Sequence, residues 1–308
     1  MLIRFRSLLL WLCMAVGNCV SAATTVVIVS SDRSAPYAEA ADALISELER
    51  TGVSRYDMLQ VTALELAGAG PLTPKMYVAL GTEAVVTLLK AESRVPVLGT
   101  LLPRSSFDHA MQVSGRKPSA QFSALYLDQP LSRQLDLIRL ALPAASRVGV
   151  LWGPDSQALS PQLKALSGNS LTVNEATVNA REPVFGALKR VLEDADVMLA
   201  VADPQVYNTN SVQNILLAAF RARVPMVAFS PAYVRAGALM AVYVTPTQIG
   251  QQAATIVRGV LQGKEMSVTP LFSQDFSVSV NEHVARSLGL TLDAETLRTR
   301  LRRKEGAP

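Results

Sequence analysis

The sequence predicts an α/β protein built from two doubly wound lobes, each containing a parallel sheet. Short β-branched runs alternate with helical patterns along the chain, which is typical of βαβ units. Two segments, Tyr77–Thr100 and Val197–Ser230, repeat the order strand, turn, helix and then a strand introduced by Arg-Val-Pro. The 308 residues are enough for two compact lobes.

The first half is expected to begin with a strand at 24–32 and a helix at 38–52. A strand at 76–80 turns through Gly81 and Thr82 into a helix, and another strand is expected within 94–103. The segment 103–124 lacks periodicity and is predicted to be a loop that leads to a crossover near residues 124–126.

The second half repeats this style. Strands are expected within 147–156, 169–178, 196–204 and 223–231, with helices at 183–194 and 211–222 between them. A second crossover is predicted within 241–248, where Pro246 ends a strand before the helix 248–263. A last strand and a helix follow within 276–290.

The N-terminus has the layout of a secretory signal peptide, with two arginines, an apolar run and a small-residue cleavage pattern ending at Ala22. The apolar core is shorter than the roughly 20 residues that span a bilayer. Cleavage would remove both cysteines, Cys13 and Cys19, so we expect neither a disulfide nor a Cys-ligated metal. The protein is therefore expected to be exported to the periplasm.

The formal charge of +4 does not predict a basic surface. Arg4 and Arg6 lie in the predicted signal peptide, and five further positive charges gather at the C-terminus, namely Arg298, Arg300, Arg302, Arg303 and Lys304. Nucleic-acid binding is therefore disfavoured. The tail 298–308 is expected to be a disordered, solvated end.

Candidate ligand contacts lie where the strands end, because open α/β sheets bind ligands beyond the carboxyl ends of their strands. These ends carry Ser31, Asp32, Thr82, Thr100, Asp155, Ser156, Asp203 and Ser230. Helix N-termini at such positions favour an anionic group. Taken alone, each of these residues is more often a helix cap than a ligand contact, since Ser, Thr and Asp are preferred caps; the functional interpretation depends on their convergence from both lobes.

Enzyme signatures are mostly absent. The two histidines, His109 and His283, accompany no G-x-S-x-G or H-E-x-x-H motif, and Gly263-Lys264 lacks the context of a P-loop. We therefore expect a binding protein without metal or cofactor. An exported α/β enzyme that uses Asp32 and Asp203 as an acid–base pair stays open as an alternative.

From about Tyr126 to Leu290 the chain resembles the periplasmic solute-binding proteins of ABC transporters, in the group that includes predicted tryptophan and tyrosine binders. The resemblance lies in DQPLSRQLDLIRLALPAASRVGVLWGPDS, in ADPQVYNTNSVQNILLAAFRARVPMVAFSPAYVRAGALMAVY, in IGQQAATIVRGVLQGK and in VNEHVARSLGL. The family's TGxNxTG-like segment is replaced by SGRKPSAQFSALYLDQ, so the resemblance is specific for fold and class and not for the ligand.

The resemblance implies a type I periplasmic-binding-protein-like fold, in which three crossovers join two lobes that close on a ligand. The first lobe would comprise 23–124 and 247–275, and the second 125–246 and 276–297, after a signal peptide at 1–22. Ser31, Asp32, Thr82 and Thr100 would line the first lobe. The second would contribute Asp155, Ser156, Asp203, Ser230 and the loop 233–237, with Trp152, Tyr207 and Tyr233 as apolar walls.

The function expected is capture of a small polar molecule, either amino-acid-like or a small carboxylate, by a monomer that serves an ABC importer. Its partners would be an inner-membrane permease and a separate ATPase. Two binding alternatives stay open: a ligand-binding sensor subunit for a membrane receptor or kinase, and a scaffold that interacts only with proteins.

Overall fold

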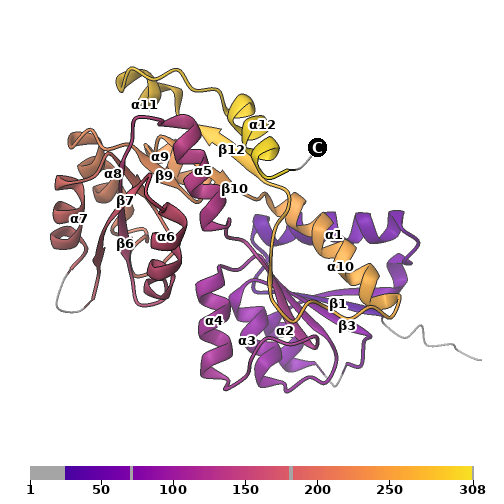
Figure 1. Cartoon of the computed structure of the whole chain (residues 1–308). Helices are drawn as coiled ribbons and strands as arrows, with labels where there is room; N and C mark the ends of the chain where they lie inside the picture. Colours follow the sequence, from indigo (N-terminus) through magenta and orange to yellow (C-terminus); the bar gives the residue numbers. More distant parts are fainter. Residues whose placement is uncertain (1–24, 70–71, 180–182, 307–308) are drawn as a thin grey trace, which may run out of the picture.

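The computed structural model describes residues 25–69, 72–179 and 183–306, and it forms two lobes that lie side by side (Figure 1). The predicted signal peptide, residues 1–22, lies outside the described residues. Each lobe is built on a six-stranded sheet with helices on both faces. The prediction of two doubly wound α/β lobes is confirmed.

The first lobe contains most of the N-terminal half and one helix from later in the chain. Its strands are β1 (Val26–Ser30), β2 (Met58–Thr62), β3 (Met76–Leu80), β4 (Val97–Thr100), β5 (Phe122–Tyr126) and β11 (Leu271–Phe272). Its helices are α1 (Ala35–Arg50), η1 (Arg55–Asp57), α2 (Ala63–Gly68), α3 (Thr82–Lys90), α4 (Arg104–Val113) and α10 (Pro246–Leu261).

The second lobe follows the same plan. Its strands are β6 (Arg147–Trp152), β7 (Thr172–Thr177), β8 (Val197–Leu199), β9 (Met226–Ala228), β10 (Met240–Tyr243) and β12 (Ser277–Val280). Its helices are α5 (Leu131–Ala141), η2 (Gln157–Leu159), α6 (Ser160–Ser167), α7 (Val184–Glu193), α8 (Val212–Arg221), α9 (Pro231–Ala236), α11 (Glu282–Ser287) and α12 (Ala294–Lys304).

The two sheets have matching strand orders. The first runs β11-β5-β4-β3-β1-β2 and the second β12-β10-β9-β8-β6-β7. All the strand pairs are parallel except that of β10 with β12. Each Arg-Val-Pro segment precedes the third strand of its sheet, β4 or β9, so the repeat in the sequence marks equivalent positions in the two lobes.

The chain passes between the lobes three times, as the fold class requires. It leaves the first sheet after β5 to enter α5, returns from β10 into α10, and crosses again between β11 and β12. Thr245 stops β10 and begins α10 with a capping box, because its hydroxyl accepts from the N–H of Gln248 while the Gln248 amide oxygen accepts from the N–H of Thr245. The second crossover therefore ends at the capped N-terminus of α10.

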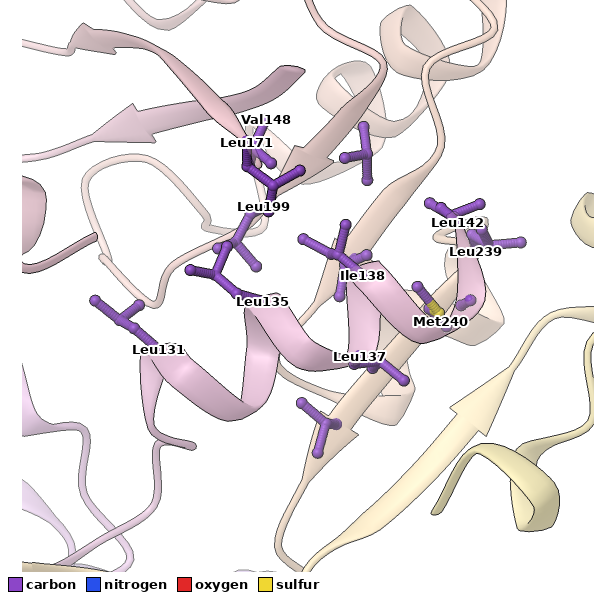
Figure 2. Packing of buried hydrophobic residues seen from close by; sticks show 14 of the residues in the cluster. Leu131, Leu135, Leu137, Ile138, Leu142, Val148, Leu171, Leu199, Leu239 and Met240 are labelled. Carbon is purple, nitrogen blue, oxygen red and sulfur yellow. The ribbon is translucent and has the colours of Figure 1, made fainter. Parts of the chain in front are cut away.

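Burial in the cores explains why interior strands such as β1 and β3 are apolar along their whole length. β1 and β3 are buried along their whole length, as parallel strands covered on both faces must be. Figure 2 shows how α5 covers one face of the second sheet, with Leu135 lying near Leu199. In the first lobe α1 and α10 pack closely, since a Cβ added to Gly250 would lie 2.3 Å from the carbonyl oxygen of Ala40.

Two segments differ from the sequence predictions. Residues 104–113 of the predicted loop form α4, whose buried Phe107, Ala110 and Met111 pack under the first sheet. Residues 298–304 of the predicted disordered tail belong to α12, which buries Leu297 and Leu301. The apolar pattern of α12 is weak because its two buried leucines, four positions apart, are surrounded by arginines.

Candidate ligand-binding cleft

A cavity of about 780 Å³ lies between the lobes, and we call it the cleft. The first lobe and its crossover line it with Asp32, Ser34, Pro36, Tyr37, Glu39, Leu101, Pro103, Leu127 and Asp128. The second lobe and the crossover to α10 line it with Ala202, Phe229, Ser230, Pro231, Ala232, Tyr233, Arg235, Tyr243, Val244, Thr245 and Pro246. The two walls belong to different lobes, so the width of the cleft depends on how far apart the lobes are.

A second cavity of about 460 Å³ lies on α3 and α4 of the first lobe. Thr82 lines it, together with His109, and Asp155 reaches it from the second lobe. The structure thus brings Thr82 and Asp155 together across the gap between the lobes, although they do not line the cleft itself.

The end of β1 is packed tightly against the start of α3. The hydroxyl of Ser31 donates to the carbonyl of Leu80 (3.0 Å) and accepts from the N–H of Ala84 (3.2 Å), so it caps α3. A Cβ on Gly81 would lie 2.5 Å from both Ser31 Oγ and the Tyr37 hydroxyl, which explains a glycine with φ of 90° at this point. Ser31 and the Tyr37 hydroxyl therefore both lie against the start of α3, and Tyr37 lines the cleft.

Aromatic rings dominate the wall of the second lobe. The rings of Phe229 and Tyr233 lie 4.8 Å apart, and the buried Tyr207 meets Phe229 edge to face at 5.8 Å. Burial raises the pKa of Tyr207 and that of Tyr233, so both hydroxyls are neutral near pH 7. Ser230 holds this wall in place, since its hydroxyl accepts from the N–H of Ala232 and begins α9.

Asp128 lies in the first crossover and lines the cleft beside Leu127. Its carboxylate accepts a short hydrogen bond from the backbone N–H of Arg104. Burial nevertheless raises the pKa of Asp128 to about 6, because desolvation of the charged form outweighs that hydrogen bond and the attraction of the Arg104 guanidinium. Asp32, by contrast, is exposed, and hydrogen bonds from Ser34 lower its pKa.

Asp203 is almost completely buried and does not line either cavity. Its Oδ2 accepts from the N–H groups of Asp155 (3.2 Å) and Ser156 (3.0 Å) and from the Ser156 hydroxyl (2.8 Å), and its Oδ1 accepts from the N–H of Gln205 (2.9 Å). The Ser156 hydroxyl also accepts from the N–H of Gly153 (3.0 Å). Asp203 and Ser156 therefore brace two strand ends of the second lobe.

Two other predicted contacts lie inside the lobes. Trp152 is 1% exposed, and its indole N–H donates to a carboxylate oxygen of Glu175 (2.9 Å). Thr100 is completely buried at the end of β4, where its hydroxyl has no hydrogen-bond partner among the described residues. Neither side chain reaches the cleft in this arrangement of the lobes, and their roles as ligand contacts stay predictions.

Of the predicted contacts, only Asp32, Ser230 and Tyr233 line the cleft. Arg235, which lies in the predicted loop 233–237, also lines it, whereas the sequence prediction missed Tyr37, Glu39, Asp128, Phe229 and Tyr243. Two of these were accessible to the same argument: Asp128 follows the apolar run of β5, and Phe229 directly follows β9. Glu39 lies within helix α1, where position relative to a strand end gives no signal.

Residues 25–69, 72–179 and 183–306 contain no group of three or more His, Cys, Asp or Glu side chains arranged to hold a metal ion. Within the same residues no helix has the length and hydropathy needed to cross a bilayer.

Comparison with known proteins identifies a family for most of the chain. Residues 72–302 match the model of the ABC transporter substrate binding protein family. A tyrosine-binding protein of Clostridioides difficile (strain R20291) is 20% identical over 217 residues, which are 69% of this chain and 62% of that protein. The match thus spans somewhat less than two thirds of that relative's length.

Solved structures share the fold. The ABC domain from Streptococcus pneumonia in complex with L-Trp is 15% identical, with a TM-score of 0.61 over 89% of this chain and 97% of that one. The ligand-free, open substrate binding protein with adhesive properties from Clostridium difficile is 18% identical, with a TM-score of 0.67 over 88% and 96%. These likenesses confirm the predicted type I periplasmic-binding-protein-like fold.

Proposed function

The chain belongs to the family of ABC transporter substrate-binding proteins, and from that premise we propose that it captures a small polar molecule in the cleft for an ABC importer. The observation that carries this proposal is that both lobes and two of the three crossovers line one cavity. A hinge motion at the crossovers brings two such walls onto a ligand.

The size and lining of the cleft support a small ligand. Its volume of about 780 Å³ lies within the range of roughly 300–1,000 Å³ that is usual for small-molecule pockets. The cleft combines apolar and aromatic surface with a few polar groups, as such pockets do. Both ligand classes expected from the sequence, an amino-acid-like molecule and a small carboxylate, are small enough for it.

The proposal includes export and transfer of the ligand to membrane partners. The predicted signal peptide at 1–22 would send the protein to the periplasm, where a permease with a separate ATPase would receive the ligand from the closed form. N-terminal sequencing of the protein released by osmotic shock tests this step, since we expect the mature chain to begin at Ala23. A mature chain that keeps residues 1–22 would contradict it.

A thermal-shift screen of amino acids, amines, small carboxylates and nucleosides tests the binding function. Aromatic amino acids belong in the screen because one relative binds tyrosine and one structural neighbour holds L-Trp. A ligand at 100 times its Kd should raise the free energy of unfolding by about 2.7 kcal/mol. Small-angle scattering of the same complex should show a smaller radius of gyration, because closure brings the lobes together.

Tyr233→Ala and Tyr56→Ala form a matched pair for this test. Tyr233 lines the cleft, whereas Tyr56 is 89% exposed on the first lobe, away from both cavities. We expect Tyr233→Ala to weaken binding of the ligand about tenfold or more by removing one face of the pocket, and Tyr56→Ala to leave it unchanged. Equal affinities in the two variants would place the ligand outside the cleft.

A further inference from the structure

The carboxylates of the cleft gather on one side. Asp32 and Glu39 belong to the first lobe, and Asp128 lies where the chain leaves that lobe. Asp32 accepts from the N–H of Ser34 (2.7 Å), and Glu39 from the Thr247 hydroxyl (2.6 Å). These donors are neutral, so they leave the negative charge of the carboxylates in place.

Basic side chains do not balance these acids. Across the described residues, 25–69, 72–179 and 183–306, the carboxylates of Asp32, Glu39 and Asp128 form no ion pair. The Arg104 guanidinium lies near Asp128 but pairs with Asp108 at 3.3 Å and donates to Gln162 at 3.4 Å. The first wall of the cleft thus carries unneutralised negative charge.

The opposite wall is aromatic. Phe229, Tyr233 and Tyr243 all belong to the second lobe and line the cleft there. Arg235 is the one basic residue among the side chains that line the cleft, and it lies exposed on α9 at this same wall. A flat apolar group can stack on such rings, and an ammonium group is attracted to their faces.

We infer that the cleft selects a ligand that carries a positively charged amine on an aromatic or similarly flat body, with the amine held by the carboxylates of the first lobe and the body against the rings of the second. This inference rests on the proposed function, because it concerns the ligand of the same cleft. A ligand whose only charge is a carboxylate is rejected, since it would be enclosed beside three acids and one exposed arginine.

Asp128 is the strongest of the three anchors. It is less exposed than Asp32 and Glu39, and a cation enclosed beside it is screened less by water. Desolvation disfavours the charged form of Asp128 and raises its pKa, so a cation held beside it offsets that cost. Among the side chains that line the cleft, the exposed Arg235 is the one cation available to a carboxylate on the ligand, and an exposed pair of this kind adds little to binding.

Calorimetry with two matched sets of probes tests this inference. Tyramine, tyrosine and 3-(4-hydroxyphenyl)propionate share one ring, and tryptamine, tryptophan and indole-3-propionate share another. In at least one set we expect the amine to bind within about tenfold of the amino acid, and the acid at least a hundredfold more weakly than the amine. The inference is overturned if the acid binds as well as the amine, if the amino acid binds more than a hundredfold better than the amine, or if neither set binds.

Variants locate the amine. Asp128→Asn should weaken tyramine or tryptamine binding by about tenfold to a hundredfold, as loss of a charge-assisted hydrogen bond does. Glu39→Gln should weaken it a fewfold, whereas Asp42→Asn, an exposed change on the same helix α1 outside the cleft, should not. Thermal melts establish that each variant is folded. If both Glu39→Gln and Asp128→Asn leave the affinity for the amine unchanged, this placement of the cation is refuted.

The two proposals fail in different ways. If the broad screen finds no ligand and no closure, the proposed function is wrong. If the screen finds a ligand that is a carboxylate or a neutral molecule, the protein is still a binding protein and only the choice of an amine is wrong.

Discussion

The C-terminal helix provides the sharpest test of how the crossovers are held. Arg133 of α5 is 6% exposed, and its guanidinium binds Glu305 through two hydrogen bonds of 2.7 and 2.9 Å. The same guanidinium donates to Gln129 (2.6 Å) in the first crossover and to the carbonyl of Ser273 (3.0 Å) in the third. It also lies 4.3 Å above the ring of Phe276. Arg133 thus ties two crossovers to the second lobe, and Glu305, the residue after α12, is its ion-pair partner.

Glu305→Gln should lower the free energy of unfolding by about 2 kcal/mol. Removing one partner of a buried ion pair costs about 3–5 kcal/mol. Glu305 is 26% exposed and glutamine keeps one acceptor, so water and the amide oxygen recover part of that cost. Asp275→Asn is the matched control, because the exposed pair of Asp275 with Arg302 should contribute less than about 1 kcal/mol.

Urea unfolding followed by tryptophan fluorescence measures this difference. Trp152 is the only tryptophan outside the predicted signal peptide, and it is buried in the second lobe beneath the same sheet that α5 covers. A double-mutant cycle with Arg133→Met should give a coupling energy above 1 kcal/mol. If Glu305→Gln is as stable as Asp275→Asn, or the coupling energy is near zero, the ion pair does not hold the crossovers.

Two further predictions concern buried groups near the cleft. Because the folded-state pKa of Asp128 is about 6, above its ordinary value of 3.8, its charge destabilises the ligand-free protein near pH 7. As the pH falls from 7.5 to 4.5, the free energy of unfolding of the unmodified protein should therefore rise relative to that of Asp128→Asn, by about 3 kcal/mol at most. Urea titrations at each pH measure both values, and an unchanged difference between the two proteins would contradict this. A Cβ on Gly153 would lie 2.3 Å from the Asp203 carboxyl carbon, so Gly153→Ala should cost about 2 kcal/mol or more in thermal melts. Gly186→Ala in α7, where nothing lies within 4 Å, should be neutral or stabilising, and equal losses in both variants would refute this packing argument.

Sequence patterns predicted most of the fold because the interior strands of the two sheets bury both faces. The apolar runs at β1, β3, β6 and β9 are distinct from the helices around them, and the strand-helix alternation then restricts the topology. α4 and α12 were missed because each buries only a few residues on one side. Their remaining positions carry polar or charged residues, so the local pattern is weak until the rest of the lobe is present.

The site was predicted less completely because position at a strand end says where a residue is, not what surrounds it. Ser31 and Ser230 both end strands and both cap helices, yet only Ser230 also lines the cleft. Tyr37 and Arg235 line it from helices α1 and α9, each seven residues beyond the end of the preceding strand. Which side chains face the gap depends on how each loop packs, and that information is distributed over the whole lobe.

Asp203 and Asp128 show this dependence most clearly. Both follow an apolar run and lie close to a proline, in VADP and YLDQP. Asp203 lies four residues beyond the interior strand β8, and the neighbouring loop after β6 folds over it, with Gly153 leaving room for the carboxylate and Ser156 donating to it. Its hydrogen bonds are made within the lobe. Asp128 lies instead where the chain leaves the sheet; among the described residues only the start of α4 donates a hydrogen bond to its carboxylate, which lines the cleft. An acid at a crossover is therefore better placed to meet a ligand than an acid at the end of an interior strand.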